Sequence, residues 1–259
     1  MRCTIPRRSL LTRSTIATLT VLCSTLHLPA LAQTSSDETN SSTEPSHEFI
    51  INDGSTRYSA KLYVSHCDAE ECQGEGRIQL FDKANQRFVQ TFRSDDLNFF
   101  LTAEQKPTVN VIQLYDEQSP LIFNDFNFDG SEDLAIRNGN QGSYSGPSYD
   151  VYVFNQSRGQ FVLSEELTAL AYENLGMFQT DPVRKRLTVF AKSGCCWHQT
   201  TEYAVVPKRG LVATKILTED AARPDGRYVY VTTETRKNGV NGKMVSKTKK
   251  YKTADYYPD

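Results

Sequence analysis

The sequence has few of the residues that catalysis most often uses, and it lacks two common catalytic motifs. Beyond residue 32 its histidines are His47, His66 and His198. It contains neither the H-E-x-x-H pattern of zinc proteases nor the G-x-S-x-G pattern of serine hydrolases. These absences predict a protein that is not an enzyme. A hydrolase that works with a pair of acidic side chains is the alternative, because Asp and Glu are plentiful.

Long apolar runs and an excess of basic charge are also missing beyond residue 32. No later stretch of about 18 apolar residues occurs, so we expect no stable membrane insertion of the mature chain. All four charges of residues 1–32 are Arg, so 25 Lys and Arg remain against 31 Asp and Glu, a formal net charge of −6. We expect no nucleic-acid partner, since binding to phosphates needs a basic surface.

The first 32 residues have the pattern of a secretion signal. Four arginines come first, no acid occurs before Asp37, and a mostly apolar stretch ends in Ala30-Leu31-Ala32. A basic start, a short apolar segment and a small-x-small ending are typical of cleaved signals. We therefore predict that residues 1–32 are a signal peptide and that the mature protein is periplasmic. An uncleaved anchor, or a lipoprotein attached through Cys23, is the alternative.

The rest of the chain changes character near Phe49. Residues 33–48 are polar and predict a disordered tether, because they cannot bury enough apolar surface to fold. From Phe49 onward, β-prone runs alternate with turn signals, and a short helix is expected only near residues 165–174. The pattern predicts an all-β, antiparallel fold that is β-propeller-like or sandwich-like. We divide it into an N-terminal β region, 49–117, and a second β region, 118–259, that ends in a basic hairpin.

Four cysteines follow the signal, and an even number in an exported chain favours disulfides. The candidates are Cys67, Cys72, Cys195 and Cys196. The first two could close a small loop, and the adjacent pair could bond to each other or reach back to the first pair. A zinc site that adds His66 and His198 is a competing interpretation. A Cys–His nucleophile is another.

An acidic stretch at residues 125–133 reads D-x-N-x-D-G-x-x-D. Calcium prefers six to eight oxygen ligands, and oxygens at alternate positions converge when the backbone coils around an ion. The predicted ligands are the side chains of Asp125, Asn127, Asp129 and Asp133 and the main-chain carbonyl of Ser131. An EF-hand is rejected because its twelfth position needs Glu, whereas Ile136 stands there. A solvated, Asx-rich turn is the alternative.

This loop resembles the calcium loop of FG-GAP repeats in integrin-type β-propellers, although Asn127 stands where Asp is common in those repeats. The resemblance implies that Ca²⁺ is the cofactor and that residues 118–259 form a propeller-like β region. Phenylalanines at 123, 126 and 128 alternate with the polar residues. They favour a loop that packs against the core over one that is only solvated.

A second motif follows in the Gly-rich stretch before the next β-prone run. Ser145, Gly146 and Tyr149 fit the pattern S-G-x-x-Y. The pattern resembles the inhibitory loop of bacterial periplasmic lysozyme inhibitors, in which Ser and Tyr enter the cleft of the enzyme. Tyr149 also begins a strand whose residues alternate between two faces, so a place in the core is the alternative for this residue.

The order of these features is more specific than either motif. A secretion signal, the acidic loop, the S-G-x-x-Y motif and "KSGCCWHQTTEY" resemble a family of calcium-binding, propeller-like periplasmic proteins. That family includes immunity proteins that inhibit the peptidoglycan-hydrolase toxins of a bacteria-killing type IV secretion system. The resemblance covers roughly residues 118–215 and implies a lysozyme-like peptidoglycan hydrolase as the protein partner. A calcium-stabilised, non-catalytic adhesion or scaffolding module is the alternative function.

Overall fold

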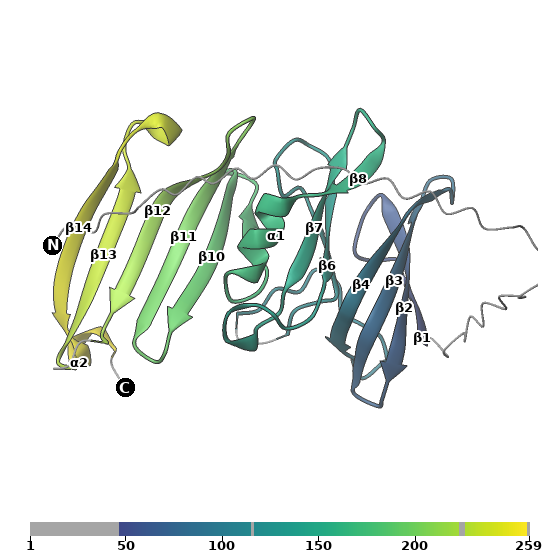
Figure 1. The fold of residues 1–259 in the computed structure, drawn as a ribbon, viewed down its shortest axis with the longest axis horizontal. Helices are drawn as coiled ribbons and strands as arrows, with labels where there is room; N and C mark the ends of the chain where they lie inside the picture. Colours follow the sequence, from purple (N-terminus) through teal and green to yellow (C-terminus); the bar gives the residue numbers. More distant parts are fainter. Residues whose placement is uncertain (1–46, 115–116, 223–225, 258–259) are drawn as a thin grey trace, which may run out of the picture. The chain divides into compact units, whose positions relative to one another are not determined.

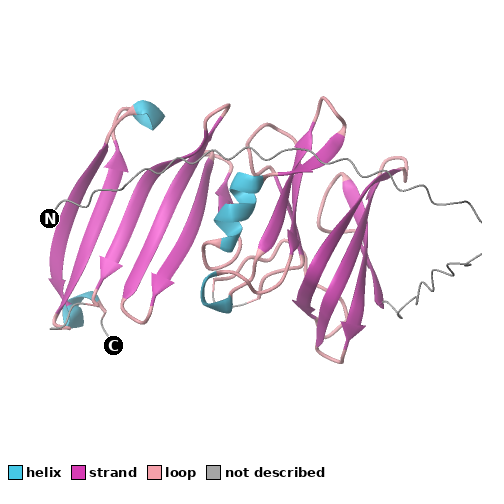
Figure 2. Cartoon of the chain, in the orientation of Figure 1, coloured by secondary structure: helices cyan, strands magenta, loops and turns pink. Residues whose placement is uncertain are grey.

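The structure is a computed structural model, and it describes residues 47–114, 117–222 and 226–257. Nearly all regular structure in these ranges is antiparallel β-strand arranged in three sheets, as Figure 2 shows. The all-β prediction is confirmed, and the fold is sandwich-like. The predicted signal peptide lies outside the described residues. The predicted tether at 33–48 overlaps the first strand, which begins at His47.

The first sheet is a simple antiparallel meander built from residues 47–100. Its order is β1 (His47–Ile51), β2 (Tyr58–Cys67), β3 (Glu71–Asp82) and β4 (Phe88–Phe100). In β2 every second residue from Tyr58 to Val64 is buried, which is the alternation expected of a strand with one covered face. The turn between β1 and β2 contains Asp53-Gly54, a residue pair that favours tight hairpin turns.

The middle sheet is a second antiparallel meander, and it is covered on both faces. Its order is β5 (Leu121–Asn124), β6 (Asp133–Arg137), β7 (Tyr149–Asn155) and β8 (Gln160–Leu163). All five residues of β6 are buried. Leu134 and Ile136 pack in a core cluster with the first sheet. Ala135 faces the other way and packs in a second cluster with the third sheet.

A short helix, α1 (Glu165–Tyr172), follows the middle sheet and packs against β7 (Figure 1). Ser164 caps it by accepting a 3.4 Å hydrogen bond from the backbone N–H of Leu167. Leu167, Leu170 and Ala171 form its buried face and complete the second core cluster. The helix expected near residues 165–174 is therefore present.

The third sheet has six antiparallel strands and contains the basic hairpin. Its strands are β9 (Gln179–Asp181), β10 (Arg186–Ser193), β11 (Trp197–Val206), β12 (Gly210–Asp220), β13 (Tyr228–Arg236) and β14 (Met244–Lys252). A one-turn helix, α2 (Thr253–Tyr256), follows. The edge strand β14 exposes Lys247, Lys249 and Lys250, and lysines on an edge strand discourage pairing with another chain. Among the described residues, no helix is long and apolar enough to cross a membrane.

Candidate functional site

The acidic loop connects β5 to β6, and its side chains fold back on its own backbone. The two carboxylate oxygens of Asp125 accept hydrogen bonds from the N–H groups of Asp129 (3.0 Å) and Gly130 (2.9 Å). Asn127 Oδ1 accepts from the N–H of Asp129 (2.9 Å), and Asp129 Oδ1 accepts from that of Ser131 (2.8 Å). These bonds direct three of the predicted ligand side chains toward the loop centre.

Gly130 makes the turn in this loop possible. Its φ angle is +89°, in a region that residues with a Cβ rarely adopt. The turn folds the chain back so that Asp133, at the start of β6, pairs with Asn124 at the end of β5. Gly130 therefore provides the reversal that brings the two ends of the loop together.

Asp133 differs from the other acids because it is fully buried. Its Oδ2 accepts from the N–H of Phe126 (2.9 Å) and its Oδ1 from that of Phe154 in β7 (2.9 Å). Burial raises the pKa of this carboxyl to about 7, although the backbone hydrogen bonds oppose the shift. Asp133 therefore joins the loop to the middle sheet, and a nearby cation would favour its ionised form.

The donor set is chemically suitable for calcium. A carboxylate oxygen has more than one lone pair, so acceptance of an N–H still leaves capacity for a cation. Within the described ranges, no group of three or more His, Cys, Asp or Glu side chains forms a metal-binding cluster. A calcium ion here would therefore depend on the amide oxygen of Asn127 and the carbonyl of Ser131 as well. The calcium site stays a prediction.

Sequence reasoning missed one acidic neighbour of this loop. Glu132 accepts a hydrogen bond from the hydroxyl of Ser55, in the turn between β1 and β2. Burial is the main cause that raises the pKa of Glu132. The two residues, with Asp53 and Asp125, line a hollow of about 450 Å³ beside the loop. No spacing rule in the sequence connects Ser55 to Glu132, which are 77 positions apart.

The loop with the S-G-x-x-Y motif connects β6 to β7, and two of its residues, Tyr144 and Ser145, are exposed. Tyr144 and Ser145 both have positive φ angles, 57° and 56°, and the side chain of Tyr144 is 57% exposed. Ser145 is also exposed. The N–H of Ser143 donates to the carbonyl of Asn174 (3.0 Å), and that of Gly142 donates to Gly146 (3.0 Å). Backbone hydrogen bonds thus fix the segment of main chain that carries these two exposed hydroxyl-bearing side chains.

Tyr149 does not project from this loop. Its side chain is 0% exposed and lies in the second core cluster. Its hydroxyl donates a 2.8 Å hydrogen bond to the carbonyl of Ser119, and burial raises its pKa. The expectation that Tyr149 enters a partner's cleft is contradicted by this burial, and the core alternative holds. The preceding Ser148 is also buried, and it donates to the carbonyl of Asn138 (2.5 Å).

Tyr144 connects this loop to the turn between β10 and β11. Its hydroxyl accepts a hydrogen bond from the backbone N–H of Gly194. The ammonium of Lys192 lies 4.9 Å from the centre of its ring, within the range of a cation–π contact. The S-G-x-x-Y pattern begins one residue later, so from the sequence Tyr144 is expected only to assist Ser145 and Tyr149.

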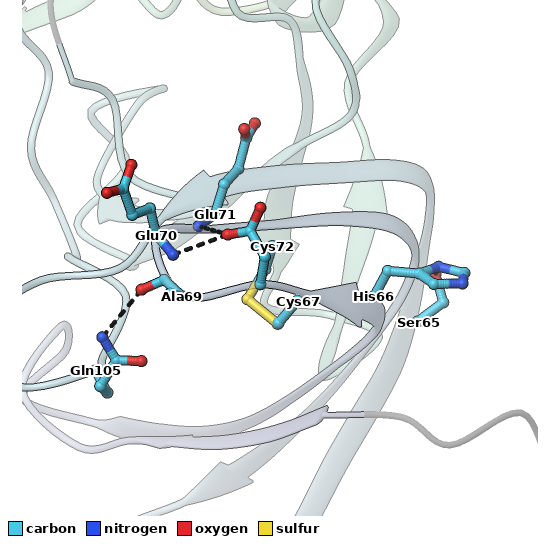
Figure 3. The surroundings of a disulfide bond; sticks show 9 residues. Ser65, His66, Cys67, Ala69, Glu70, Glu71, Cys72 and Gln105 are labelled. Carbon is cyan, nitrogen blue, oxygen red and sulfur yellow. Dashed lines mark hydrogen bonds between the residues drawn. A yellow bond between two sulfur atoms is a disulfide. The ribbon is translucent and has the colours of Figure 1, made fainter.

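The structure pairs the four cysteines locally. Cys67 bonds to Cys72 across the turn between β2 and β3 (Figure 3). In the same turn Asp68 accepts hydrogen bonds of 2.8 Å from the N–H groups of both Glu70 and Glu71. Cys195 bonds to its neighbour Cys196 in the turn between β10 and β11. Bridges between the two pairs are therefore not formed.

The two competing interpretations of the cysteines are not supported. The ring of His66 lies away from the Cys67–Cys72 bond in Figure 3 and contacts Ser65 Oγ at 3.1 Å. The ring of His198 stacks on Phe190, with centroids 5.8 Å apart. All four sulfurs are in bridges, so no thiol in the described part of the chain is left for a metal or for nucleophilic attack.

Comparisons with known proteins support the fold. No family model matches the chain, and no curated protein matches it. A solved structure described as a Xanthomonas type IV secretion system related protein is similar, with a TM-score of 0.59 and 21% sequence identity. The match covers 80% of this chain and 95% of that one. At this level of identity, the similarity concerns the fold.

Proposed function

We propose that this protein is a periplasmic inhibitor of a lysozyme-like peptidoglycan hydrolase and that residues 143–146 make the inhibitory contact. The observation that carries the proposal is the loop itself. It exposes Tyr144 and Ser145, while backbone hydrogen bonds and the buried Tyr149 hold its two ends. A preorganised loop loses little conformational entropy on binding, so more of its contact energy appears as affinity.

The chemistry of the two exposed side chains suits such a target. Glycan hydrolases work with two carboxyl groups that face each other across a cleft. The hydroxyl of Ser145 can donate a hydrogen bond to one of them, and the ring of Tyr144 can occupy a sugar subsite. The loop contains no glycosidic bond, so the enzyme cannot cleave it. Tyr144 replaces Tyr149 in this role.

Three further observations support the setting. The similar solved structure belongs to a type IV secretion system related protein, which favours a role associated with such a system. Local disulfides such as Cys67–Cys72 are compatible with a periplasmic or secreted protein. The net charge of −6 for residues 33–259 would attract a basic hydrolase electrostatically.

Calcium enters the proposal as a structural cofactor. Asp125, Asn127 and Asp129 would hold the ion, and Asp133 would extend its effect to the middle sheet. An ion that neutralises these acids would stabilise the folded conformation of the loop between β5 and β6. Residues 138–148, which connect β6 to β7 and are called the Ser145 loop below, leave β6 at the end opposite the acidic loop. Calcium would therefore stabilise the scaffold and would not itself take part in inhibition.

The test is inhibition of a panel of lysozyme-like hydrolases by the mature protein and its variants. Tyr144→Ala should weaken inhibition about thirtyfold, because truncation of a central aromatic contact often costs about 2 kcal/mol. Ser145→Ala should weaken it less. Both variants should keep the melting temperature of the wild type. Tyr257→Ala is the matched control, since it removes another exposed tyrosine, at 43% exposure, from the far end of the chain.

Two outcomes would contradict the proposal. Full inhibition by the double variant Tyr144→Ala, Ser145→Ala would show that the loop is not the inhibitory element. If the wild type inhibits no hydrolase on a broad panel, the non-catalytic adhesion or scaffolding module becomes the better function.

A further inference from the structure

A pocket of about 700 Å³ lies beside the Ser145 loop, and its interior has no role in the proposed inhibition, although Tyr144 and Ser145 are among its lining residues. Its size falls within the usual range for small-molecule sites, about 300–1,000 Å³. Tyr144 and Pro147 contribute one wall from the loop. Residues of β3, β4, β6 and β10 contribute other walls, so four strands from all three sheets meet around one space. Connecting segments add Glu117, Gln118, Asn140 and Leu175.

The unusual group in this pocket is Arg137, the last residue of β6. Its side chain is only 6% exposed. Nη1 donates to the carbonyl of Gln118 (3.2 Å) and Nη2 to Oδ1 of Asn140 (2.5 Å), and both acceptors are neutral. Nε is buried and has no hydrogen-bond partner among the described residues. Asp96 and Glu71 are near enough to favour the charged form of Arg137, but neither carboxylate hydrogen-bonds to its guanidinium. A buried cation whose hydrogen-bond acceptors are all neutral favours an added anion.

Acidic side chains line the same pocket and restrict which anion fits. Glu71 and Glu117 are both lining residues. Glu71 accepts from Nδ2 of Asn98 (2.6 Å), and Glu117 accepts from the hydroxyl of Thr108 (2.6 Å). Lys192 also lines the pocket, so with Arg137 two cationic and two acidic side chains surround it. A multiply charged anion such as phosphate would upset this balance, whereas a ligand that carries an ammonium group together with its carboxylate matches it.

Apolar lining supplies the third element of recognition. Phe100 at the end of β4 is 54% exposed. It lines the pocket together with Leu175, which lies just beyond α1. A site with apolar walls and a few polar groups of opposite charge is typical of sites for small amphipathic ligands.

We propose that this pocket binds a small zwitterion: an amino acid, or a short peptide with a free amino group and a free carboxylate, that has an apolar side chain. The carboxylate pairs with the guanidinium of Arg137, which can offer two parallel N–H donors. The ammonium lies against Glu71 and Glu117, and the side chain lies on Phe100 and Leu175. The proposal does not require hydrolase inhibition, although the two proposals share Tyr144 and Ser145, and its test contains no hydrolase.

The experiment measures binding to the mature protein by isothermal titration calorimetry. The probes are L-leucine, D-leucine and the dipeptide L-leucyl-L-leucine. Leucinamide lacks the carboxylate and N-acetyl-L-leucine lacks the ammonium, so both should bind at least tenfold more weakly than the best probe. Inorganic phosphate should not bind at this site. Binding of a free leucine identifies an amino acid as the source of the zwitterion, and binding of the dipeptide alone identifies a peptide; either result supports the site.

Two variants locate the ligand. Glu71→Gln keeps an oxygen that can accept from Asn98 but removes the negative charge. It should weaken binding of the best probe about tenfold and leave binding of N-acetyl-L-leucine unchanged, because that probe has no ammonium group. Arg137→Lys keeps a positive charge but loses the planar fork, and it should weaken every probe with a carboxylate. Glu48→Gln, which removes an exposed acid from β1, is the control and should bind like the wild type.

The proposal is overturned by any of three results. The first is that no probe binds the wild type at about 10 mM, a concentration that would nearly saturate a site with a dissociation constant of about 1 mM. The second is that leucinamide or phosphate binds as well as the best probe. The third is that Glu71→Gln leaves binding unchanged. This variant keeps the test decisive if Arg137→Lys fails to fold.

Discussion

The hydroxyl of Tyr149 donates a 2.8 Å hydrogen bond to the carbonyl oxygen of Ser119. Tyr149 is the first residue of β7, and Ser119 lies just before β5, so the bond joins two segments 30 positions apart. Both residues are fully buried. Tyr149 therefore anchors the end of the Ser145 loop in the core, and the loop depends on it for position.

Tyr149→Phe should lower the free energy of unfolding by about 1–3 kcal/mol, because it leaves the buried carbonyl of Ser119 without its donor. Urea unfolding of the mature protein measures this change. Tyr63→Phe is the control: the hydroxyl of Tyr63 is 3.5 Å from Gln79 Oε1 in a half-buried position, so its removal should change stability little. Equal stability of wild type and Tyr149→Phe would contradict the anchoring role.

The case of Tyr149 shows what the sequence can and cannot predict. Alternation along β7 reveals that Tyr149 and Val151 share one face, and turn residues reveal the hairpins. The sequence does not reveal that both faces of the middle sheet are covered, because that depends on sheets contributed by distant segments. A tyrosine at the edge of a Gly-rich loop could therefore be assigned to the surface or to the core with equal reason.

The acidic loop could be predicted from the sequence and the pocket could not, because only the loop is formed by neighbouring residues. The loop is local, so a nine-residue pattern predicts its turn and the direction of its side chains. The pocket brings Glu71 near Arg137 from strands of different sheets, and neither residue belongs to a motif. Long-range assembly leaves no short-range signal, so the pocket could be found only in the folded chain.

Calcium should raise the melting temperature of the mature protein relative to chelator. A ligand that binds only the native state adds about 2.7 kcal/mol at 100 times its dissociation constant. Asp129→Ala should abolish most of the difference, whereas Asp181→Ala, an acid outside the loop, should leave it intact. Equal melting temperatures with and without calcium, together with no calcium by elemental analysis, would exclude the site.

The mature protein should contain no free thiol when it is purified from an oxidising compartment. Thiol titration of denatured, unreduced protein checks this point. Peptide mapping by mass spectrometry should then find Cys67 linked to Cys72 and an internal bridge between Cys195 and Cys196. A peptide that joins either of the first two cysteines to either of the last two would refute the local pairing.

Asp150 should make the protein less stable as pH rises. Burial is the main cause that raises the pKa of this carboxyl, although Asn138 donates to it at 3.0 Å. The folded state then holds the proton to a higher pH than the unfolded chain, whose pKa is about 3.9. The stabilisation from this group is complete below that pH and is lost as pH rises through the folded pKa.

Asp150→Asn should therefore flatten the decline of unfolding free energy above about pH 4, and urea unfolding across pH measures it. Asp181→Asn is the contrasting variant. Hydrogen bonds from Arg184, first from its backbone N–H, lower the pKa of Asp181, so this acid contributes with the opposite sign. An unchanged pH profile for Asp150→Asn would show that burial of this group does not control its protonation.

Gly142→Ala should change the conformation of the Ser145 loop, because there is no space for a Cβ at this position. The φ angle of Gly142 is −67°, which any residue can adopt, so backbone strain is not the cause. A Cβ at this position would lie 2.8 Å from the carbonyl oxygens of both Gly146 and Pro147. These oxygens belong to the backbone, so the loop itself must shift, and inhibition should weaken at least tenfold if this loop enters the cleft.

Gly159→Ala is the matched control for that experiment. Gly159 lies in the turn between β7 and β8 with a φ of +63°, and a Cβ there meets nothing within 4 Å. Its replacement should cost stability through backbone strain, about 1 kcal/mol, without moving the Ser145 loop. Inhibition assays and melting curves on both variants separate the two effects. If Gly142→Ala loses stability but inhibits like Gly159→Ala, the conformation of residues 143–146 is not what the hydrolase recognises.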